Sequence, residues 1–552
     1  MPHLVDEKLI GCDRLECRRL IDMYKSLHVT SLEHALELVK QNKMYVDVIA
    51  ILLNKVAEAE AKVKLLNQKH FGDSSERKKN PPKHPIKGSK GRGRGQKSNG
   101  KGHGRTALPK DLPTVEEILT IPEKERTCST CHQVFPEFGK PEVSEILEVE
   151  VKGYKRKIIR PKYKTCNCGG HSKIITAPPA KRLIPKSSLG VSVISKFISN
   201  KYVLSMPIER TCKELASFIG QKSPGTIIGA LEYVSSYFDP LHDLIYEKLM
   251  TENYFNCDET FTKVFEKIEG KANYKWYIWG IFSKSVRYFR YGSNRSTENL
   301  TELFKGLDKS IKEIVILADR FSSYKCFANI QTLITVIVAF CWAHVRRDFL
   351  DGATAYPEHA DWMFSWKKKI GELFAINNNR VICWNPELPL SEQKEDFQII
   401  HKELGEKLLA MKKEMETELI NEKLPVAKRK ILESLQRHWV GLTHFYERPY
   451  IKMDNNLSER ELRLCVLGRK NFYGAGSIWS AELSAKMYSF VKTFELWGLN
   501  ATKGIYEYLL ACSENGGKPP NLNEFLPWEM SEERKQFFRE PMITNRPDML
   551  KA

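Results

Sequence analysis

The order of β-rich segments after residue 252 constrains the fold of this chain more than any other feature. Three such segments follow one another, YFNCDETFTKVF, YKWYIWGIFS and SVRYFRYGS. A helix-like segment, STENLTELFKGL, comes next, and then EIVILADRFSSYKCF, in which an apolar run ends at Asp319. Runs rich in β-branched and aromatic residues are typical of strands. The segments therefore predict three strands, one helix and a fourth strand, in that order.

This order matches the start of a ribonuclease H-like fold, in which the first and fourth strands are neighbours. Asp258 lies midway along the first predicted strand, and Asp319 lies at the tip of the fourth. We therefore expect the two carboxylates to be close enough to share a metal. Cleavage of a phosphodiester needs an activated water and a stabilised leaving oxygen, and a pair of Mg²⁺ ions held by oxygen ligands supplies both. A third acid on a later helix would complete such a site.

The stretch DNNLSERELRLCVLGRKN offers candidates for this third acid. Glu459 is the first, but Asn456 and Glu459 also fit a capping box, which needs no catalysis. Glu459 could also pair with Arg463 one turn later. On this stretch alone, capping is favoured. Glu461 lies about 200° away around a helix and cannot face the same metals, whereas Asp454, before the helix, remains an alternative.

The charge of the chain predicts a polyanionic partner. The formal net charge is +19, which favours nucleic acid. Between Arg77 and Lys110 there are 12 Lys or Arg residues and no acid, among Gly, Pro, Ser and Asn. Such a segment cannot bury enough apolar surface to fold alone, so we expect an arm that contacts phosphates; a solubilising linker is the alternative. The predicted DNA-binding residues are Arg77, Lys78, Lys79, Arg92, Arg94 and Arg105.

Residues 31–68 have the pattern of a long helix. Apolar residues recur at alternating spacings of three and four, with Ile49, Val56 and Val63 at one heptad position and Leu52 and Leu66 at another. Such a pattern favours a parallel two-stranded coiled coil. We therefore predict a homodimer through residues 31–68; an amphipathic helix packed on its own chain is the alternative.

Two cysteine pairs predict a small zinc module. Cys128 and Cys131 form CSTC, and Cys166 and Cys168 form CNC, on either side of a segment that alternates like two strands turning near Gly153. Converging thiolates suit tetrahedral Zn²⁺, which stabilises a small core. Four unrelated reduced thiols are the alternative. The chain has no export signal and no apolar run long enough to span a bilayer, so we expect no membrane association and a reducing compartment.

Two further regions have helical patterns. PIERTCKELASFIGQKSPGTIIGALEYV predicts a helix ending at Gly220, then Ser223 as N-cap and Pro224 at the first helical position of the next helix, which resembles a helix-turn-helix. The interval from about Leu350 to Tyr450 looks like an inserted helical subdomain. Its tryptophans could stack on an unpaired DNA base, although core packing is the commoner fate; they are Trp362, Trp366, Trp384 and Trp439.

Taken together, these motifs resemble the insertion sequence 66 family of transposases, a branch of the DDE transposases. CDET, LADRFSSY, CWAHVRRDF and DNNLSERELRLCVLGRKNFYGAGS occur in the order of that family's core motifs, and HFGDSSERKK and the four cysteines resemble its other features. The resemblance implies that Asp258, Asp319 and Glu459 form the catalytic triad and bind Mg²⁺, as two ions, or Mn²⁺. It favours Glu459 as a metal ligand, although one residue can both bind and cap.

Other residues near these motifs are candidates for active-site support. Cys341 and His344 match a C-x-x-H element of several DDE families; DNA positioning or packing is expected there rather than a metal, with His344 the better functional candidate. Basic residues in the motifs are expected to contact phosphates, and a solvated charge is the alternative for each. The support candidates are His344, Arg346, Arg347, Arg463, Arg469 and Lys470.

We therefore predict a multidomain α+β protein. The predicted regions are a helical coiled-coil dimerisation region (1–75), a basic flexible linker (76–112), a zinc-binding β module (113–182), a helical, helix-turn-helix-like DNA-binding region (183–250), the first part of a ribonuclease H-like α/β catalytic core (251–350), a helical insertion (351–450), the second part of the core (451–499) and a C-terminal helical tail (500–552).

The predicted function is that of a DNA transposase. It would bind the terminal inverted repeats of its own mobile element, free 3′-OH ends and join them to target DNA. A catalytically silent or domesticated DNA-binding protein and a ribonuclease H-like nuclease that only hydrolyses are the alternatives. The predicted partners are transposon-end and target DNA, a second copy of the chain, and small accessory proteins of the same element. The predicted location is the cytoplasm of a bacterium or archaeon, in association with DNA.

Overall fold

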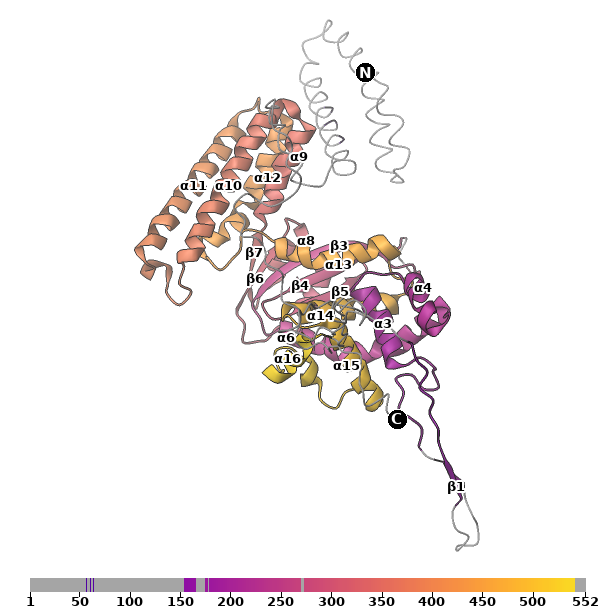
Figure 1. The fold of residues 1–552 in the computed structure, drawn as a ribbon. Coiled ribbons are helices and arrows are strands. Elements are labelled where there is room, and N and C mark those ends of the chain that lie inside the picture. Colours follow the sequence, from indigo (N-terminus) through magenta and orange to yellow (C-terminus); the bar gives the residue numbers. More distant parts are fainter. Residues whose placement is uncertain are drawn as a thin grey trace, which may run out of the picture.

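The computed structural model describes residues 153–164, 174–176, 178–269 and 273–541, together with Val56, Glu60 and Val63 (Figure 1). Val56, Glu60 and Val63 are helical. The rest of the predicted coiled coil, the basic linker and the four cysteines of the predicted zinc module lie outside the described residues.

A small antiparallel ladder joins β1 (Lys162–Lys164) to β2 (Ile174–Thr176). The prediction of a strand on the C-terminal side of a turn near Gly153 is wrong for residues 153–161, which form no strand. A Cβ atom at Gly153 would lie 2.2 Å from the carbonyl oxygen of Phe218, so this glycine lies closely against the helix that contains Phe218. Because Pro161 has no N–H to donate, it suits the position just before a strand.

The central sheet has five strands in the order β5-β4-β3-β6-β7. They are β3 (Tyr254–Lys263), β4 (Lys275–Phe282), β5 (Arg287–Gly292), β6 (Glu313–Ala318) and β7 (Thr335–Phe340). β3, β4 and β5 are antiparallel neighbours, whereas β6 pairs in parallel with both β3 and β7. Helix α7 (Thr297–Phe304) lies between β5 and β6 in the sequence. The predicted order of three strands, a helix and a strand, and the pairing of the first strand with the fourth, are confirmed.

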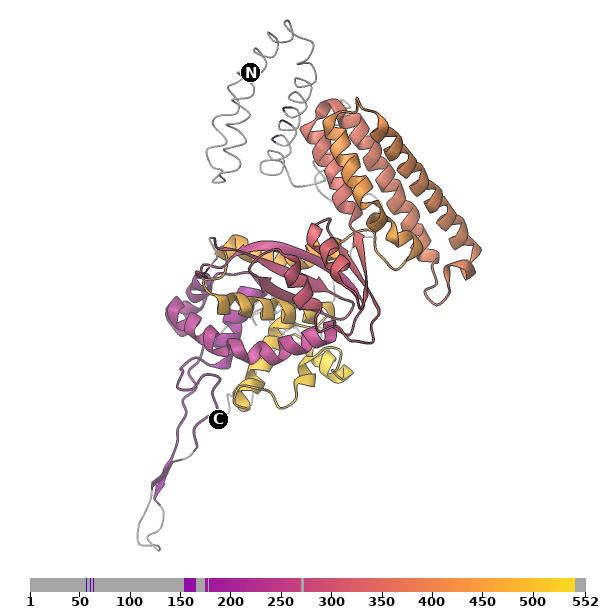
Figure 2. The same ribbon diagram turned by 180° about the vertical axis from the view of Figure 1, so that it is seen from behind.

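Helices cover both faces of this sheet (Figures 1 and 2). Side chains alternate between the faces along β3. Phe255 and Cys257 belong to a core shared with α6 (Asp239–Leu249), α7 and α8 (Ser322–Ile330). Asn256 and Thr260 point the other way, toward α13 (Asn456–Phe472). Asp258 lies between them in the sequence and shares their face of the strand.

The helices before β3 and those after α13 share one core. Besides α6, which contributes Leu241, they are α3 (Val191–Tyr202), α4 (Ile208–Ile219), α5 (Pro224–Ser235), α14 (Ile478–Leu496), α15 (Ala501–Glu514) and α16 (Glu532–Arg539). Short 3-10 helices occur at Ser236–Phe238, Pro357–His359, Leu390–Glu392 and Leu522–Phe525. On α14, the hydroxyls of Ser489 and Thr493 form hydrogen bonds with the backbone of β5. These bonds give partners to backbone N–H and C=O groups that an edge strand would otherwise leave unpaired.

The predicted signals between α4 and α5 are confirmed. α4 is followed by Gly220, whose φ of +72° suits glycine. Ser223 is the N-cap of α5 and accepts a hydrogen bond from the Thr226 N–H at 3.2 Å, and Pro224 is the first helical residue.

The predicted helical insertion is a bundle beside the sheet (Figure 1). It contains α9 (Trp342–Ala355), α10 (Ala360–Cys383), α11 (Glu395–Ile420) and α12 (Val426–Glu447). Trp366 and Trp439 are buried in its core. The suggestion that they stack on a DNA base is therefore wrong for these two, and they pack in the core instead. Trp362 is partly buried and donates to Glu418 at 2.8 Å. None of the described helices combines the length and low polarity that a bilayer span requires.

Candidate active site

The sheet brings Asp258 and Asp319 together. β3 and β6 run parallel, with Asn256 opposite Leu317. Two residues further on, the same register sets Asp258 beside Asp319, where β6 has just ended. Asp319 is 27% exposed, and its carboxylate accepts from the Phe321 N–H at 2.9 Å, which orients it at the start of the loop.

Helix α13 is fastened to β3 by its N-cap residue, Asn455, which is 1% exposed. The Asn455 side chain accepts from Asn256 Nδ2 at 2.9 Å and donates to the carbonyl of Cys257 at 2.8 Å. It also accepts from the Ser458 hydroxyl at 2.8 Å. These bonds link the start of α13 to the strand that carries Asp258, and Glu459 lies one turn into the helix.

Glu459 points to basic groups on α9. Its carboxylate lies 3.3 Å from Nε2 of His344 and 3.4 Å from a guanidinium nitrogen of Arg347. The predicted capping box with Asn456 is not formed, because Asn455 is the N-cap and its side chain is engaged with the sheet. Within the described residues, Glu459 and Arg463 form no ion pair.

The two alternative acids are engaged elsewhere. Asp454 accepts from the Asn456 N–H at 3.1 Å and so stabilises the turn that begins α13. Glu461 is paired with Arg287 at 3.4 Å and with Lys492 at 3.0 Å, and its side chain is only 12% exposed. The prediction that Glu461 faces away from Glu459 is confirmed by these partners.

The charges of the acids interact. Burial raises the pKa of Asp258 well above its ordinary value, and the carboxylates of Glu259, Asp319 and Glu459 raise it further. The Glu259 backbone N–H, which donates to Asp258 at 2.8 Å, opposes this shift. Asp258, Asp319 and Glu459 are therefore near enough to repel one another, and a cation among them would relieve that repulsion.

Glu259, beside Asp258, is a buried acid that was not among the predicted site residues. The side chain of Glu259 is fully buried on the other face of β3 and accepts from the Tyr324 hydroxyl at 2.6 Å. Arg295 donates to Glu259 at 2.5 Å, lies 3.5 Å from Asp319 and stacks on Phe321, with 3.6 Å to the ring centroid. Glu259 is visible in CDET, but no local pattern connects it with Arg295, which lies in a loop between β5 and α7.

Of the six predicted support residues, two contact Glu459 and four lie elsewhere on α9 and α13. His344 and Arg347 contact Glu459; burial, and then the charge of Arg347, lower the pKa of His344. Arg469 is further along α13, where it donates to Thr260 at 3.2 Å and stacks on Phe261. Arg463 and Lys470 are exposed on α13, and Arg346 is partly buried on α9.

Cys341 has a packing role. It is fully buried at the N-cap of α9, and its sulfur accepts from the Asn455 N–H at 3.1 Å. This contact ties the start of α9, which carries His344, to the start of α13, which carries Glu459.

The donor set of this site fits a hard divalent cation. Mg²⁺ and Mn²⁺ prefer carboxylate oxygens, and the crowded carboxylates of Asp258, Asp319 and Glu459 favour a positive charge between them. Within residues 153–164, 174–176, 178–269 and 273–541, no group of three His, Cys, Asp or Glu side chains forms a ready coordination sphere.

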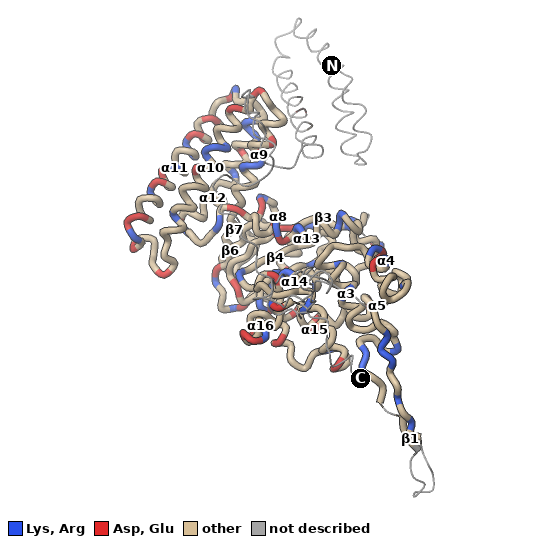
Figure 3. The backbone as a smooth tube through the Cα atoms, viewed as in Figure 1, with Lys and Arg blue, Asp and Glu red and all other residues tan. Residues whose placement is uncertain are grey.

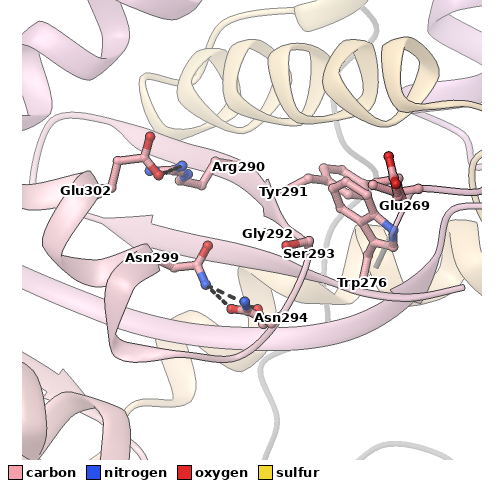
Figure 4. A pocket seen from close by; sticks show the side chains of 10 residues that line it. Glu269, Trp276, Arg290, Tyr291, Gly292, Ser293, Asn294, Asn299 and Glu302 are labelled. Atoms are coloured by element: carbon pink, nitrogen blue, oxygen red, sulfur yellow. Dashed lines mark hydrogen bonds and ion pairs between the residues drawn. The ribbon is translucent and has the colours of Figure 1, made fainter. Parts of the chain in front are cut away.

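An open cavity of about 620 Å³ lies at the β5 side of the sheet (Figure 4). Its wall contains Trp276, Tyr291 and Asn299, and an ion pair between Arg290 and Glu302 at 2.9 Å. It contains none of the three acids, so it is separate from the candidate active site.

A sheet that brings two aspartates together, with a glutamate on a helix docked across it, defines a carboxylate site suited to metal-dependent chemistry. Residues 186–483, more than half of the chain, match the profile of the Transposase IS66 family. The chain belongs to this family, and membership gives it the role of a transposase, with the use of DNA and divalent metal that this class implies.

Two relatives come from Sinorhizobium fredii (strain NBRC 101917 / NGR234). The uncharacterized protein y4jD is 23% identical over 444 residues, covering 76% of this chain and 81% of y4jD. The uncharacterized protein y4hP is 21% identical over 434 residues, covering 75% of each chain. No solved structure matches this chain.

Proposed function

We propose that this transposase cleaves DNA at the ends of its mobile element and joins the freed 3′-OH ends to target DNA, with Asp258, Asp319 and Glu459 as metal ligands of a ribonuclease H-like core. The observation that carries the proposal is the convergence of these three acids: β3 and β6 align the aspartates, and the Asn455 bonds dock α13 beside them. The strand order of the sheet supports the same assignment.

The three carboxylates would hold Mg²⁺ or Mn²⁺, which supplies Lewis acidity and an activated nucleophile when bound. The chain's own residues position the reacting groups. His344 and Arg347 hold the carboxylate of Glu459 in place. Arg295, held by Glu259, lies beside Asp319, where its guanidinium adds positive charge near a bound phosphate.

Basic segments support DNA binding outside the site. The extended segment before and within β1 carries Lys155, Arg156, Lys157, Arg160 and Lys162, all exposed (Figure 3). Together with the basic residues of 77–110, these side chains would contact phosphates without reading sequence. Zn²⁺ at Cys128, Cys131, Cys166 and Cys168 and pairing of two chains through residues 31–68 remain parts of the proposal.

The test is a cleavage and strand-transfer assay on labelled element-end DNA. We compare the wild type with Glu459→Gln, in Mg²⁺ and in Ca²⁺, and use Glu482→Gln, an exposed glutamate on α14, as the matched control. The expected result is that the wild type and Glu482→Gln expose and join 3′ ends in Mg²⁺, whereas Glu459→Gln binds the DNA and does neither.

Other outcomes would support other functions. Cleavage by Glu459→Gln at the wild-type rate would refute the assignment of Glu459. Cleavage without joining by the wild type would favour a nuclease that only hydrolyses. Binding without cleavage by the wild type, with the accessory proteins of the element supplied, would favour a DNA-binding protein.

A further inference from the structure

A group of cationic side chains lies beside Asp319, where the helical insertion meets the sheet. Arg320 follows Asp319 and donates to the Ser434 hydroxyl of α12 at 3.1 Å. On the same helix, the His438 ring nitrogen Nδ1 lies 2.6 Å from the Ser434 carbonyl oxygen. Arg320 and His438 are thus held at one turn of α12.

Lys325 of α8 lies near the same turn of α12, because it and His438 contact one aromatic ring. Its ammonium lies 5.3 Å from the centroid of the Phe340 ring, and the His438 ring packs edge-on against the same ring at 5.2 Å. Arg437, the residue before His438, is exposed. The basic cluster therefore consists of Arg320, Lys325 and Arg437, drawn from the loop after β6, from α8 and from α12.

The positive charge of the basic cluster is only partly balanced within the described part of the chain. Asp348 pairs with Arg320, but no acidic side chain among the described residues pairs with Lys325 or Arg437. Burial lowers the pKa of Lys325, and the charges of Arg437 and Arg320 lower it further. Lys325 and Arg437 thus place like charges near each other without an acidic partner, and an external anion would relieve their repulsion.

The basic cluster is continuous with the candidate active site. Arg320 is adjacent in sequence to Asp319, and its guanidinium pairs with Asp348 of α9, the helix that also carries His344 and Arg347. A chain of phosphates leaving the three acids toward the insertion would pass Arg320, the residue next to Asp319.

We propose that Arg320, Lys325 and Arg437 form a phosphate-binding surface for DNA that leaves the active site toward the helical insertion. This proposal rests on the proposed function for its partner. It gives the insertion a direct part in holding DNA, through charge on α12 rather than through its buried tryptophans.

The experiment measures the salt dependence of DNA binding by the full chain. The probe is a fluorescent duplex of random sequence, followed by anisotropy from about 50 to 200 mM KCl. The test variant is Lys325→Gln/Arg437→Gln. The matched control, Lys402→Gln/Lys413→Gln, removes the same charge from exposed positions of α11.

We expect the test variant to lower the slope of log K against log [salt] by about 1.8, since each phosphate contact contributes about 0.9. The control should keep the wild-type slope. Lys325→Arg/Arg437→Lys, which retains both charges, should restore the slope and so exclude an effect of shape. Arg437→Gln alone changes an exposed position and should lower the slope by about 0.9. This single variant tests the proposal if the double variant unfolds.

A wild-type slope in Lys325→Gln/Arg437→Gln, or an equal loss in the α11 control, would overturn the proposal. The assay requires no cleavage, so its failure is distinct from that of the proposed function. A wild type that binds through this surface but never cuts DNA would refute the proposed chemistry alone.

Discussion

Asn455 should be the residue whose loss most directly separates Glu459 from Asp258. We consider Asn455→Ala, which removes three side-chain hydrogen bonds, to Asn256, Cys257 and Ser458. All of them lie in the buried contact between the start of α13 and β3, where water cannot replace the lost partner.

The expected cost follows from these bonds. A neutral hydrogen bond contributes about 1 kcal/mol, and a buried group left without its partner costs about 1–3 kcal/mol. Asn455→Ala takes the acceptor from the Asn256 amide and from the Ser458 hydroxyl. We therefore expect the free energy of unfolding to fall by roughly 3–5 kcal/mol.

Urea unfolding followed by tryptophan fluorescence measures this loss. With an m-value of about 3 kcal/mol per molar, the midpoint should fall by roughly 1–1.7 M. The matched control is Asn456→Ala: the next residue is also asparagine, but its side chain is exposed, so the change should stay within about 0.5 kcal/mol. Equal midpoints for the two variants would refute the reasoning, as would wild-type strand cleavage by Asn455→Ala under conditions where it is folded.

Three further changes test other parts of the structure. Trp366→Ala should destabilise the insertion by about 3–5 kcal/mol in urea unfolding, because this buried ring stacks on Phe349; a loss of DNA binding at unchanged stability would instead favour base stacking. Burial lowers the pKa of His242 to about 4. Between about pH 6.5 and pH 4 this histidine is protonated in the unfolded chain but neutral in the folded protein, so the free energy of unfolding falls as the pH is lowered through this range. His242→Gln should therefore lose about 2 kcal/mol less than the wild type between pH 7 and pH 5, and equal pH dependence would contradict this. Arg295→Gln should slow strand cleavage by about a hundredfold with DNA affinity unchanged, because it removes the guanidinium beside Asp319; unchanged cleavage would show that Arg295 has no part in it.

Local patterns predicted much of the core. The order of strands after residue 252 and the signals at Gly220, Ser223 and Pro224 depend on short-range periodicity and turn chemistry, and the structure has each of them. The pairing of β3 with β6 followed from the match of that order to a known fold. The nearness of Asp258 and Asp319 followed because two adjacent parallel strands carry them.

Contacts between distant residues could not be predicted in this way. DNN is compatible with several caps, and the choice of Asn455 over Asn456 depends on a strand about 200 residues earlier, which offers the Asn256 amide and the Cys257 carbonyl. The contacts of Arg295 were unpredictable for the same reason. Its partners Glu259 and Asp319 come from β3 and from the end of β6, and no residue in its own loop indicates them.

The junction of the helical insertion with the sheet explains how Glu459 lies near Asp319, although the two are 140 positions apart in the sequence. The N–H of Trp342, where the insertion begins, donates to the carbonyl of Met453, where it ends, at 2.8 Å. Two residues on, the Asn455 N–H donates to the sulfur of Cys341. The chain therefore leaves the sheet and returns to it at one place, and the insertion can form its own core while Glu459 keeps its position relative to β3. The same junction carries His344, so the residue that contacts Glu459 is fixed at the point where the insertion joins the sheet.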